Sequence, residues 1–227
     1  MEWAATKNIG YLTCADANFG MYKERDMEIA KVIKEVADRS TIDSVNLIYA
    51  KNSTEIVFEI ARLMGEYSKG VTVAVQSMHK PTLKAIKRVN MKSNDIAHML
   101  SLGEQYGGVT THTDIILGLP LETLESWKQG FSEILELGQH DGIEMVFSIL
   151  LENSEMNNPE YRRLYGIKSI AAQDYMPFFN EDDWREVEET FDIVNQTNTM
   201  STKDIIEGYL YGWMVIHFHN SGYSQLI

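Results

Sequence analysis

An alternation of short β-branched segments with amphipathic helical segments constrains the fold of this chain most strongly. The segments predicted as strands are apolar, and they are residues 9–15, 45–49, 71–75, 110–117 and 144–151. Between them apolar residues recur at helical spacing, as in Ile29, Ile33 and Val36. Strands that alternate with helices at the length of a βα unit favour a parallel sheet or barrel over a sandwich. The sequence therefore predicts an α/β fold.

The third predicted strand is followed by residues suited to binding a ligand. Gln76 and Ser77 follow residues 71–75, and Pro81 then opens a helix that ends near Arg88. An amide suits hydroxyl groups and a guanidinium suits a carboxylate, so the two side chains would make a pocket at the carboxyl end of the strand. The alternative is a glutamine at a sheet edge and a solvated arginine at a helix end.

Polar residues also follow the other predicted strands. The remaining candidates are Asp16 and Asn18 after the first strand, Lys51 and Asn52 after the second, and Asp114 within the fourth. All but Asp114 fall at carboxyl ends, where folds of this class keep their ligand sites. A carboxylate among the isoleucines and leucines of a strand needs a partner or a ligand to offset its desolvation. Four strands thus contribute to one predicted pocket.

Composition excludes several classes of function. The formal net charge of -13 in 227 residues argues against a nucleic-acid partner, because phosphates are held by clustered Lys and Arg. No apolar run reaches the length of a membrane span, and the first residues lack the features of a secretory signal, so we expect a cytoplasmic protein. The single cysteine, Cys14, excludes an intrachain disulfide and any metal site built from several thiolates. We expect Cys14 to be a small core residue and predict no metal ligands.

The pattern changes at residue 153. We expect two domains, residues 1–152 with the strands and residues 153–227 as a helical extension. Within the extension, a stripe that contains Phe191 predicts one helix and residues 205–217 predict a second, which we expect to be mostly covered. Earlier in the chain, Glu122 is better explained as the start of a helix than as an acid or base.

Five segments together resemble the radical S-adenosylmethionine (SAM) superfamily, and specifically the group that often carries an N-terminal cobalamin-binding domain. They are VAVQSMHKPTLKAIKR, DIILGLPLETLESW, CADANFGMYKERDMEIA, ENSEMNNPEYRRLYGI and TNTMSTKDII. The resemblance implies a partial (βα)6 TIM-like barrel that holds SAM across its strand ends. By position it implies that Gln76 and Asp114 bind the ribose, that Arg88 binds the methionine carboxylate, and that Asp16, Asn18, Lys51, Asn52 and Ser77 lie around the same ligand.

One departure from the family pattern bears on mechanism. Family members carry a CxxxCxxC loop whose thiolates hold a [4Fe-4S] cluster, and this sequence has none. The sequence resembles a family member without its first strand, its cluster loop and any cobalamin domain. The parent protein would use SAM and the cluster, with cobalamin as a further candidate cofactor. We expect this chain alone to be inactive in SAM cleavage, and to self-associate through the sheet edge at residues 9–15.

Two function classes remain open at this stage. The first is the C-terminal part of a radical SAM enzyme that acts on an unknown small molecule, with cobalamin-dependent methylation as a candidate reaction. The second is a non-catalytic barrel remnant that binds a nucleoside or a protein partner. The loops that would contact a substrate carry no motif that identifies it.

Overall fold

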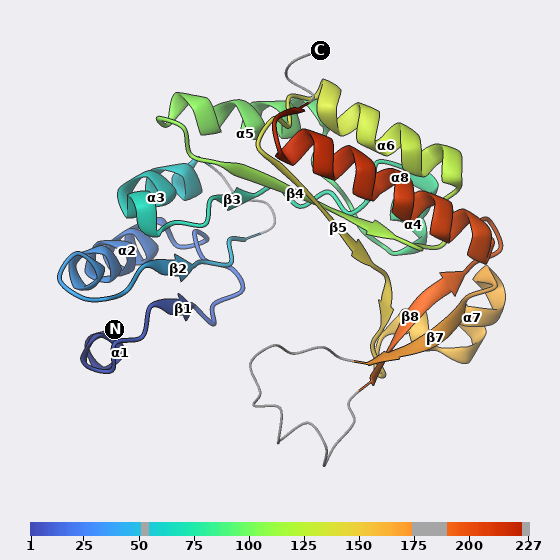
Figure 1. Cartoon of the computed structure of the whole chain (residues 1–227), viewed down its shortest axis with the longest axis horizontal. Coiled ribbons are helices and arrows are strands. Elements are labelled where there is room, and N and C mark those ends of the chain that lie inside the picture. The colour runs from blue at the N-terminus through green and yellow to red at the C-terminus, as the bar shows by residue number, and fades with distance from the viewer. Residues whose placement is uncertain (51–54, 174–189, 224–227) are drawn as a thin grey trace. The chain divides into compact units, whose positions relative to one another are not determined.

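The computed structural model describes residues 1–50, 55–173 and 190–223 of the chain (Figure 1). The chain divides into two compact units. Unit 1 comprises Met1–Val75, Met91–Asp114 and Ile134–Glu144, and unit 2 comprises Gln76–Asn90, Ile115–Glu133 and Met145–Ile227.

The strands of unit 1 pair in parallel. Strand β1 (Tyr11–Thr13) pairs with β2 (Ser44–Asn46), and β3 (Val71–Thr72) pairs with β4 (Thr111–Leu117). The sheet that contains β3 has the order β3-β4-β5, with β5 at Gly142–Phe147. These pairings confirm the parallel arrangement predicted from the alternation of strands and helices.

Helices α2 (Lys23–Ala37), α3 (Ile56–Met64) and α5 (Ser93–Gln105) of unit 1 bury one apolar face each. Two shorter elements, α1 (Glu2–Thr6) and the 3-10 turn η1 (Gly65–Tyr67), accompany them. Helix α2 packs against α3, and Ile33 and Val36 of α2 are buried. Ile60 and Met64 of α3 are completely buried as well. Spacings of three and four residues place such side chains on one helix face, so the sequence pattern correctly predicted both helices.

Unit 2 combines helices with a small antiparallel sheet. Its elements are α4 (Lys80–Ala85), most of α6 (Leu124–Glu136), β6 (Ile149–Leu150), the 3-10 turn η2 (Glu155–Asn157), α7 (Pro159–Tyr165), β7 (Lys168–Gln173), β8 (Thr190–Gln196) and α8 (Thr202–Asn220). The sheet has the order β6-β8-β7, and both pairings are antiparallel. Leu150, Ile167 and Val194 form its small core.

Helix α8 lies along α6 (Figure 1) and approaches it closely through two glycines. The indole Nε1 of Trp127 donates a hydrogen bond of 3.0 Å to the carbonyl of Gly208. A Cβ at Gly208 would lie 3.3 Å from the Trp127 ring, and one at Gly212 would lie 3.1 Å from the ring of Phe131. Ser201 and Asp204 form a capping box that fixes where α8 begins.

Two sequence predictions for this part of the chain are wrong, and the first is that residues 153–227 form a helical extension. Residues 190–196 form strand β8 and not a helix, and residues 168–173 form β7 in what was expected to be a helical extension. The helical stripe included Trp184 and Val187, which lie outside the described residues. The β-branched residues of β8 gain a ladder with β7, in which Ile193 opposes Ile170, and this long-range pairing overrides the local spacing.

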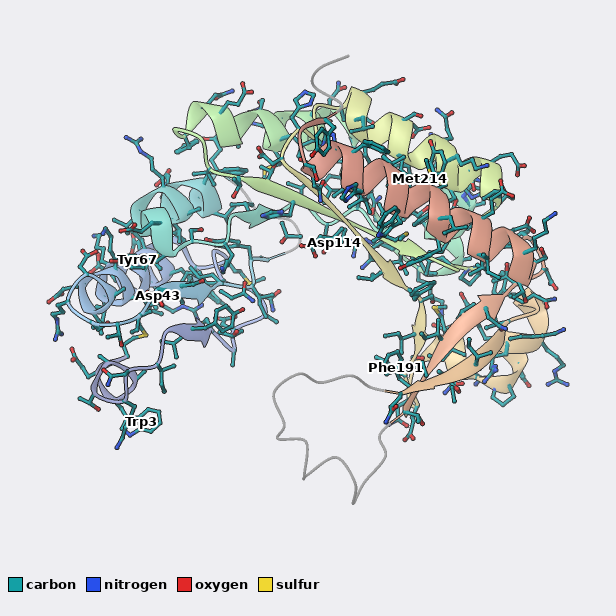
Figure 2. The ribbon with its side chains drawn as sticks, in the orientation of Figure 1. Trp3, Asp43, Tyr67, Asp114, Phe191 and Met214 are labelled. Atoms are coloured by element: carbon teal, nitrogen blue, oxygen red, sulfur yellow. The ribbon has the colours of Figure 1, made fainter. Side chains whose placement is uncertain are left out.

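The second wrong prediction is that the last helix is mostly covered. One face of α8 packs within unit 2, where Ile205 and Gly208 are buried. Ile206, Trp213 and Met214 keep 57%, 53% and 53% of their surface exposed, and Met214 can be located on α8 in Figure 2. A wide apolar stripe therefore does not imply burial on all sides.

Within the described ranges, no helix combines the length and apolar character needed to cross a membrane.

Candidate functional site

The segment after β3 is held in an unusual backbone conformation. Gln76 has a φ of 64°, a left-handed value that residues other than glycine rarely adopt. Its carbonyl accepts the N–H of Ile116 at 2.8 Å, and an isolated parallel bridge pairs it with Ile115. The pairing to β4 therefore continues to the end of the segment and fixes the backbone from which the Gln76 side chain projects.

Ser77 connects this segment to a buried carboxylate. Its hydroxyl donates a hydrogen bond of 2.5 Å to Oε2 of Glu122 and accepts the N–H of His79 at 3.0 Å. Ser77 is only 4% exposed, so this hydroxyl serves the protein's own structure. The sequence predicted Ser77 beside the ligand, and in the structure its buried hydroxyl is bonded to Glu122 and His79.

Glu122 precedes α6 and is 1% exposed, which the sequence did not predict. Its second carboxylate oxygen accepts a hydrogen bond from the hydroxyl of Ser126, and its carbonyl accepts one of 2.6 Å from Thr199. Nδ1 of His79 lies 4.0 Å from the same carboxylate oxygen. Glu122 therefore ties three segments of unit 2 together in addition to marking the start of a helix.

Arg88 is held beside the same segment by Asn90. Helix α4 ends at Ala85, Lys87 adopts a left-handed φ of 54°, and the N–H of Arg88 donates to the carbonyl of Leu83 at 2.8 Å. The guanidinium Nε of Arg88 donates to Oδ1 of Asn90 at 3.1 Å. The amide Nδ2 of Asn90 donates to the carbonyl of Ser77 at 2.9 Å. The sequence had singled out Arg88 but not Asn90.

In unit 1, the loop after β1 is built on two carboxylates. Asp16 accepts the N–H of Asn18 at 2.9 Å and an ion pair of 2.9 Å from Arg25. Asp26, completely buried, accepts the N–H groups of Gly20 and Tyr22 at 2.8 and 3.0 Å and a bond of 2.6 Å from Arg25.

These contacts set the charge state of Asp26. Burial by itself would raise the pKa of the Asp26 carboxyl, but hydrogen bonds from Arg25 and from two backbone N–H groups outweigh it and hold the pKa below its ordinary value. The loop that carries the candidates Asp16 and Asn18 is therefore anchored by a buried anion.

Asp114 lies on β4 (Figure 2), in a strand that alternates between two faces. Thr111, Thr113 and Ile115 are buried, whereas His112 and Asp114 are half-buried on the other face. Alternation thus places Asp114 on the less buried face of β4, whereas the sequence analysis had treated it as a carboxylate desolvated among isoleucines and leucines.

The other candidates divide between the two units. Lys51 and Asn52 lie outside the described residues. Asp16, Asn18 and Asp114 belong to unit 1, and Gln76, Ser77 and Arg88 to unit 2. Their convergence on one ligand stays a prediction, whereas the link between the segments of Gln76 and Arg88 is direct.

The residues of this chain do not fit an iron–sulfur cluster. A [4Fe-4S] cluster takes three or four thiolates, and the sequence contains one cysteine. Among the residues that the structure describes, no group of three His, Cys, Asp or Glu side chains could hold a metal ion. The thiolates of any cluster would have to come from outside this chain.

Two curated proteins match the chain over its whole length. It is 30% identical over 232 residues to the cobalamin-dependent radical SAM methyltransferase TokK of Streptomyces tokunonensis. It is 31% identical over 234 residues to the 2-(S-pantetheinyl)-carbapenam-3-carboxylate methyltransferase of Streptantibioticus cattleyicolor. Each match covers 100% of this chain and 33% of the relative, so the chain spans about a third of their length. No family model matches it.

A solved structure has the same fold. The radical SAM methyltransferase TsrM from Kitasatospora setae, with its tryptophan substrate and a SAM analogue bound, matches with a TM-score of 0.63 at 15% identity. The match covers 95% of this chain and 45% of TsrM. A second structure of TsrM, with cobalamin and a [4Fe-4S] cluster bound, gives a TM-score of 0.61 at 14% identity over 93% of this chain and 45% of TsrM. At such identities the similarity concerns the fold alone.

The mixed α/β fold and the sequence matches define this chain as a homologue of radical SAM enzymes. More narrowly, it is related to cobalamin-dependent radical SAM methyltransferases and corresponds to a portion of such a protein. The superfamily resemblance predicted from the sequence is confirmed.

Proposed function

We propose that this chain provides the SAM-binding part of a cobalamin-dependent radical SAM methyltransferase that acts on a small molecule. The observation that carries the proposal is the match to TokK at 30% identity over the whole chain. Because that match covers a third of TokK, methylation and its cobalamin dependence are proposed for the complete protein and not for this chain alone. The proposed architecture is a partial (βα)6 barrel in residues 1–152, with residues 153–227 attached to it.

The donor groups of unit 2 suit a ligand that combines a ribose with an amino acid. In the proposed complex the Gln76 amide binds a ribose hydroxyl and the Arg88 guanidinium binds the methionine carboxylate. Asp114 would accept hydrogen bonds from the ribose, and Asp16 and Asn18 would lie near the amino group. When bound, SAM supplies the methyl group and the radical precursor, and the role of these residues is to bind and orient it.

A second candidate function is a nucleoside-binding or protein-interaction module without catalysis. The single cysteine favours this alternative, since the chain's own residues cannot hold the cluster at which SAM is cleaved. A nucleoside-binding module would share SAM binding with the first function, so activity and not affinity separates those two, whereas a protein-interaction module need not bind a nucleoside.

Titration calorimetry with S-adenosylhomocysteine tests the binding proposal on the 227-residue chain. We expect binding that weakens about tenfold or more in Arg88→Ala, because a charge-assisted hydrogen bond contributes roughly 1.5–3 kcal/mol. Lys84→Ala removes a cation from α4 and is the matched control, with affinity expected to change less than about twofold. No binding by the unmodified chain, or equal losses in both variants, would contradict the proposal.

Anaerobic reconstitution tests whether the chain itself carries the chemistry. With iron, sulfide, dithionite and SAM added, we expect no 5′-deoxyadenosine above a control without protein, because the chain has one thiolate to offer. Product together with a stoichiometric cluster absorbance would show that other residues of this chain hold the cluster.

A further inference from the structure

Asn90 joins the two segments that carry Gln76 and Arg88. Its amide Nδ2 donates to the carbonyl of Ser77 at 2.9 Å, and its Oδ1 accepts from the Nε of Arg88 at 3.1 Å. One side chain thus uses its donor and its acceptor to fix the peptide that follows Gln76 relative to the guanidinium of Arg88.

The Ser77 end of this link is rigid. The Ser77 hydroxyl is bonded to the buried Glu122 and to the N–H of His79, and the carbonyl of Gln76 is bonded to Ile116 on β4. Asn90 therefore anchors Arg88 to the part of unit 2 from which Gln76 projects.

At its Arg88 end, the link holds a long side chain. An arginine side chain has several rotatable bonds, and ordering it costs up to about 2 kcal/mol of conformational entropy. The bond from Nε to Asn90 restrains the plane of the guanidinium, and this plane sets the direction of the terminal nitrogens that form paired bonds with a carboxylate. The left-handed backbone at Gln76 and at Lys87, which directly precedes Arg88, indicates that the surrounding structure constrains both segments.

We propose that Asn90 is a positioning residue that sets the placement of the Arg88 guanidinium relative to Gln76, for a ligand that carries both a ribose and an amino-acid carboxylate. The inference rests on the proposed function, because it assigns a partner to the two residues that would hold the ends of SAM. Asn90 acts through Arg88, so its effect depends on whether the ligand has a carboxylate.

Two ligands separate this role from a purely structural one. S-Adenosylhomocysteine carries the ribose and the carboxylate, whereas 5′-methylthioadenosine carries the ribose and lacks the amino acid. We expect Asn90→Ala to weaken binding of the first about tenfold and binding of the second less than about twofold. In an Arg88→Ala background, Asn90→Ala should add less than about twofold, because the group that it orients is gone.

Asn198→Ala is the matched control variant. The Asn198 amide also donates to a backbone carbonyl, that of Leu164 at 3.0 Å, so the substitution removes a comparable structural bond in the same unit. We expect it to leave the ratio of the two affinities unchanged.

The Nε–H resonance of Arg88 in a ¹⁵N-labelled protein gives a readout without ligand. We expect this Nε–H to be protected from solvent exchange in the unmodified chain. The protection should weaken in Asn90→Ala and be retained in Asn90→Asp, which keeps the acceptor for Arg88. Asn90→Asp also serves if Asn90→Ala fails to fold, since loss of the signal in Asn90→Asp would then overturn the proposal.

The outcomes distinguish this inference from the proposed function. If Arg88→Ala weakens S-adenosylhomocysteine binding but Asn90→Ala does not, or if Asn90→Ala weakens both ligands equally, Asn90 is not a positioning residue and the proposed function stands. If the unmodified chain binds neither ligand, the proposed function fails and this inference fails with it.

Discussion

Each unit of the molecule contains a buried carboxylate that organises a candidate loop, but the two are stabilised differently. Asp26 in unit 1 receives two backbone N–H groups and the guanidinium of Arg25. Glu122 in unit 2 receives the hydroxyls of Ser77 and Ser126, with the ring of His79 at 4.0 Å. The carboxylate of Asp26 is thus paired with a guanidinium, whereas the hydrogen-bond donors to Glu122 are two serine hydroxyls.

This difference predicts different responses to loss of charge. Around Asp26 all the partners can only donate, so a replacement that cannot accept leaves buried donors and a cation without a partner. A hydroxyl can donate or accept, so the partners of Glu122 can rotate to suit an amide. The loss in the free energy of unfolding on replacing a buried carboxylate therefore depends on which groups donate hydrogen bonds to it.

The largest effect is expected for Asp26→Ala. Loss of the acceptor for Gly20, Tyr22 and Arg25 should lower the free energy of unfolding by about 3 kcal/mol, measured by urea denaturation. Asp38→Ala is the control, because the exposed Asp38 pairs with Lys34 on the helix surface, where solvent screens the ion pair and its loss has little effect on stability. A loss below about 1 kcal/mol in Asp26→Ala would remove the distinction between the two sites.

A smaller effect is expected from acidification. Because the pKa of Asp26 in the folded chain lies below its ordinary value, its contribution is complete above the ordinary value of about 4 and is lost as the pH falls through the folded pKa. The difference in unfolding free energy between the unmodified chain and Asp26→Asn should therefore shrink as the pH is lowered from about 5 toward about 2. A difference that stays constant over this range would mean that Asp26 does not fold as an anion.

The smallest effect is expected for Glu122→Gln. The amide has nearly the same shape and the Ser77 and Ser126 hydroxyls can rotate, so we expect a loss within about 1 kcal/mol. Asp26→Asn is the comparison variant, with a loss about 2 kcal/mol larger, since its amide nitrogen would face donors. Equal losses in the two variants, by the same urea measurement, would contradict the argument from donor type.

The sequence predicted the secondary structure correctly where the spacing of apolar residues alone determines it. Strand ends followed from the β-branched runs, which is why Gln76 and Arg88 were found. Asp26 was missed because it stands among charged residues at the start of α2, a composition typical of a solvated helix face. Asn90 was missed because its two partners come from tertiary structure, and no spacing along the chain indicates them.

The antiparallel sheet of unit 2 is a case in which the local sequence pattern does not determine the secondary structure. Phe191 and Val194 are three residues apart, which suits a helix, yet the same stretch is rich in β-branched residues. Pairing with β6 and β7 decides between the two, and those partners are distant in sequence. Local pattern could not resolve this choice because the deciding free energy comes from long-range pairing.

The two glycines of α8 have a consequence for how that helix can move. Gly208 and Gly212 are one helical turn apart, and each faces an aromatic ring of α6, Trp127 and Phe131. Sliding α8 by one turn would bring Asp204 or Ile216 opposite one of these rings, where even a Cβ would lie only 3.3 or 3.1 Å from the ring. The two glycines therefore fix the register of α8 against α6, because a shift of one turn replaces a glycine with a larger side chain at one of the two close contacts.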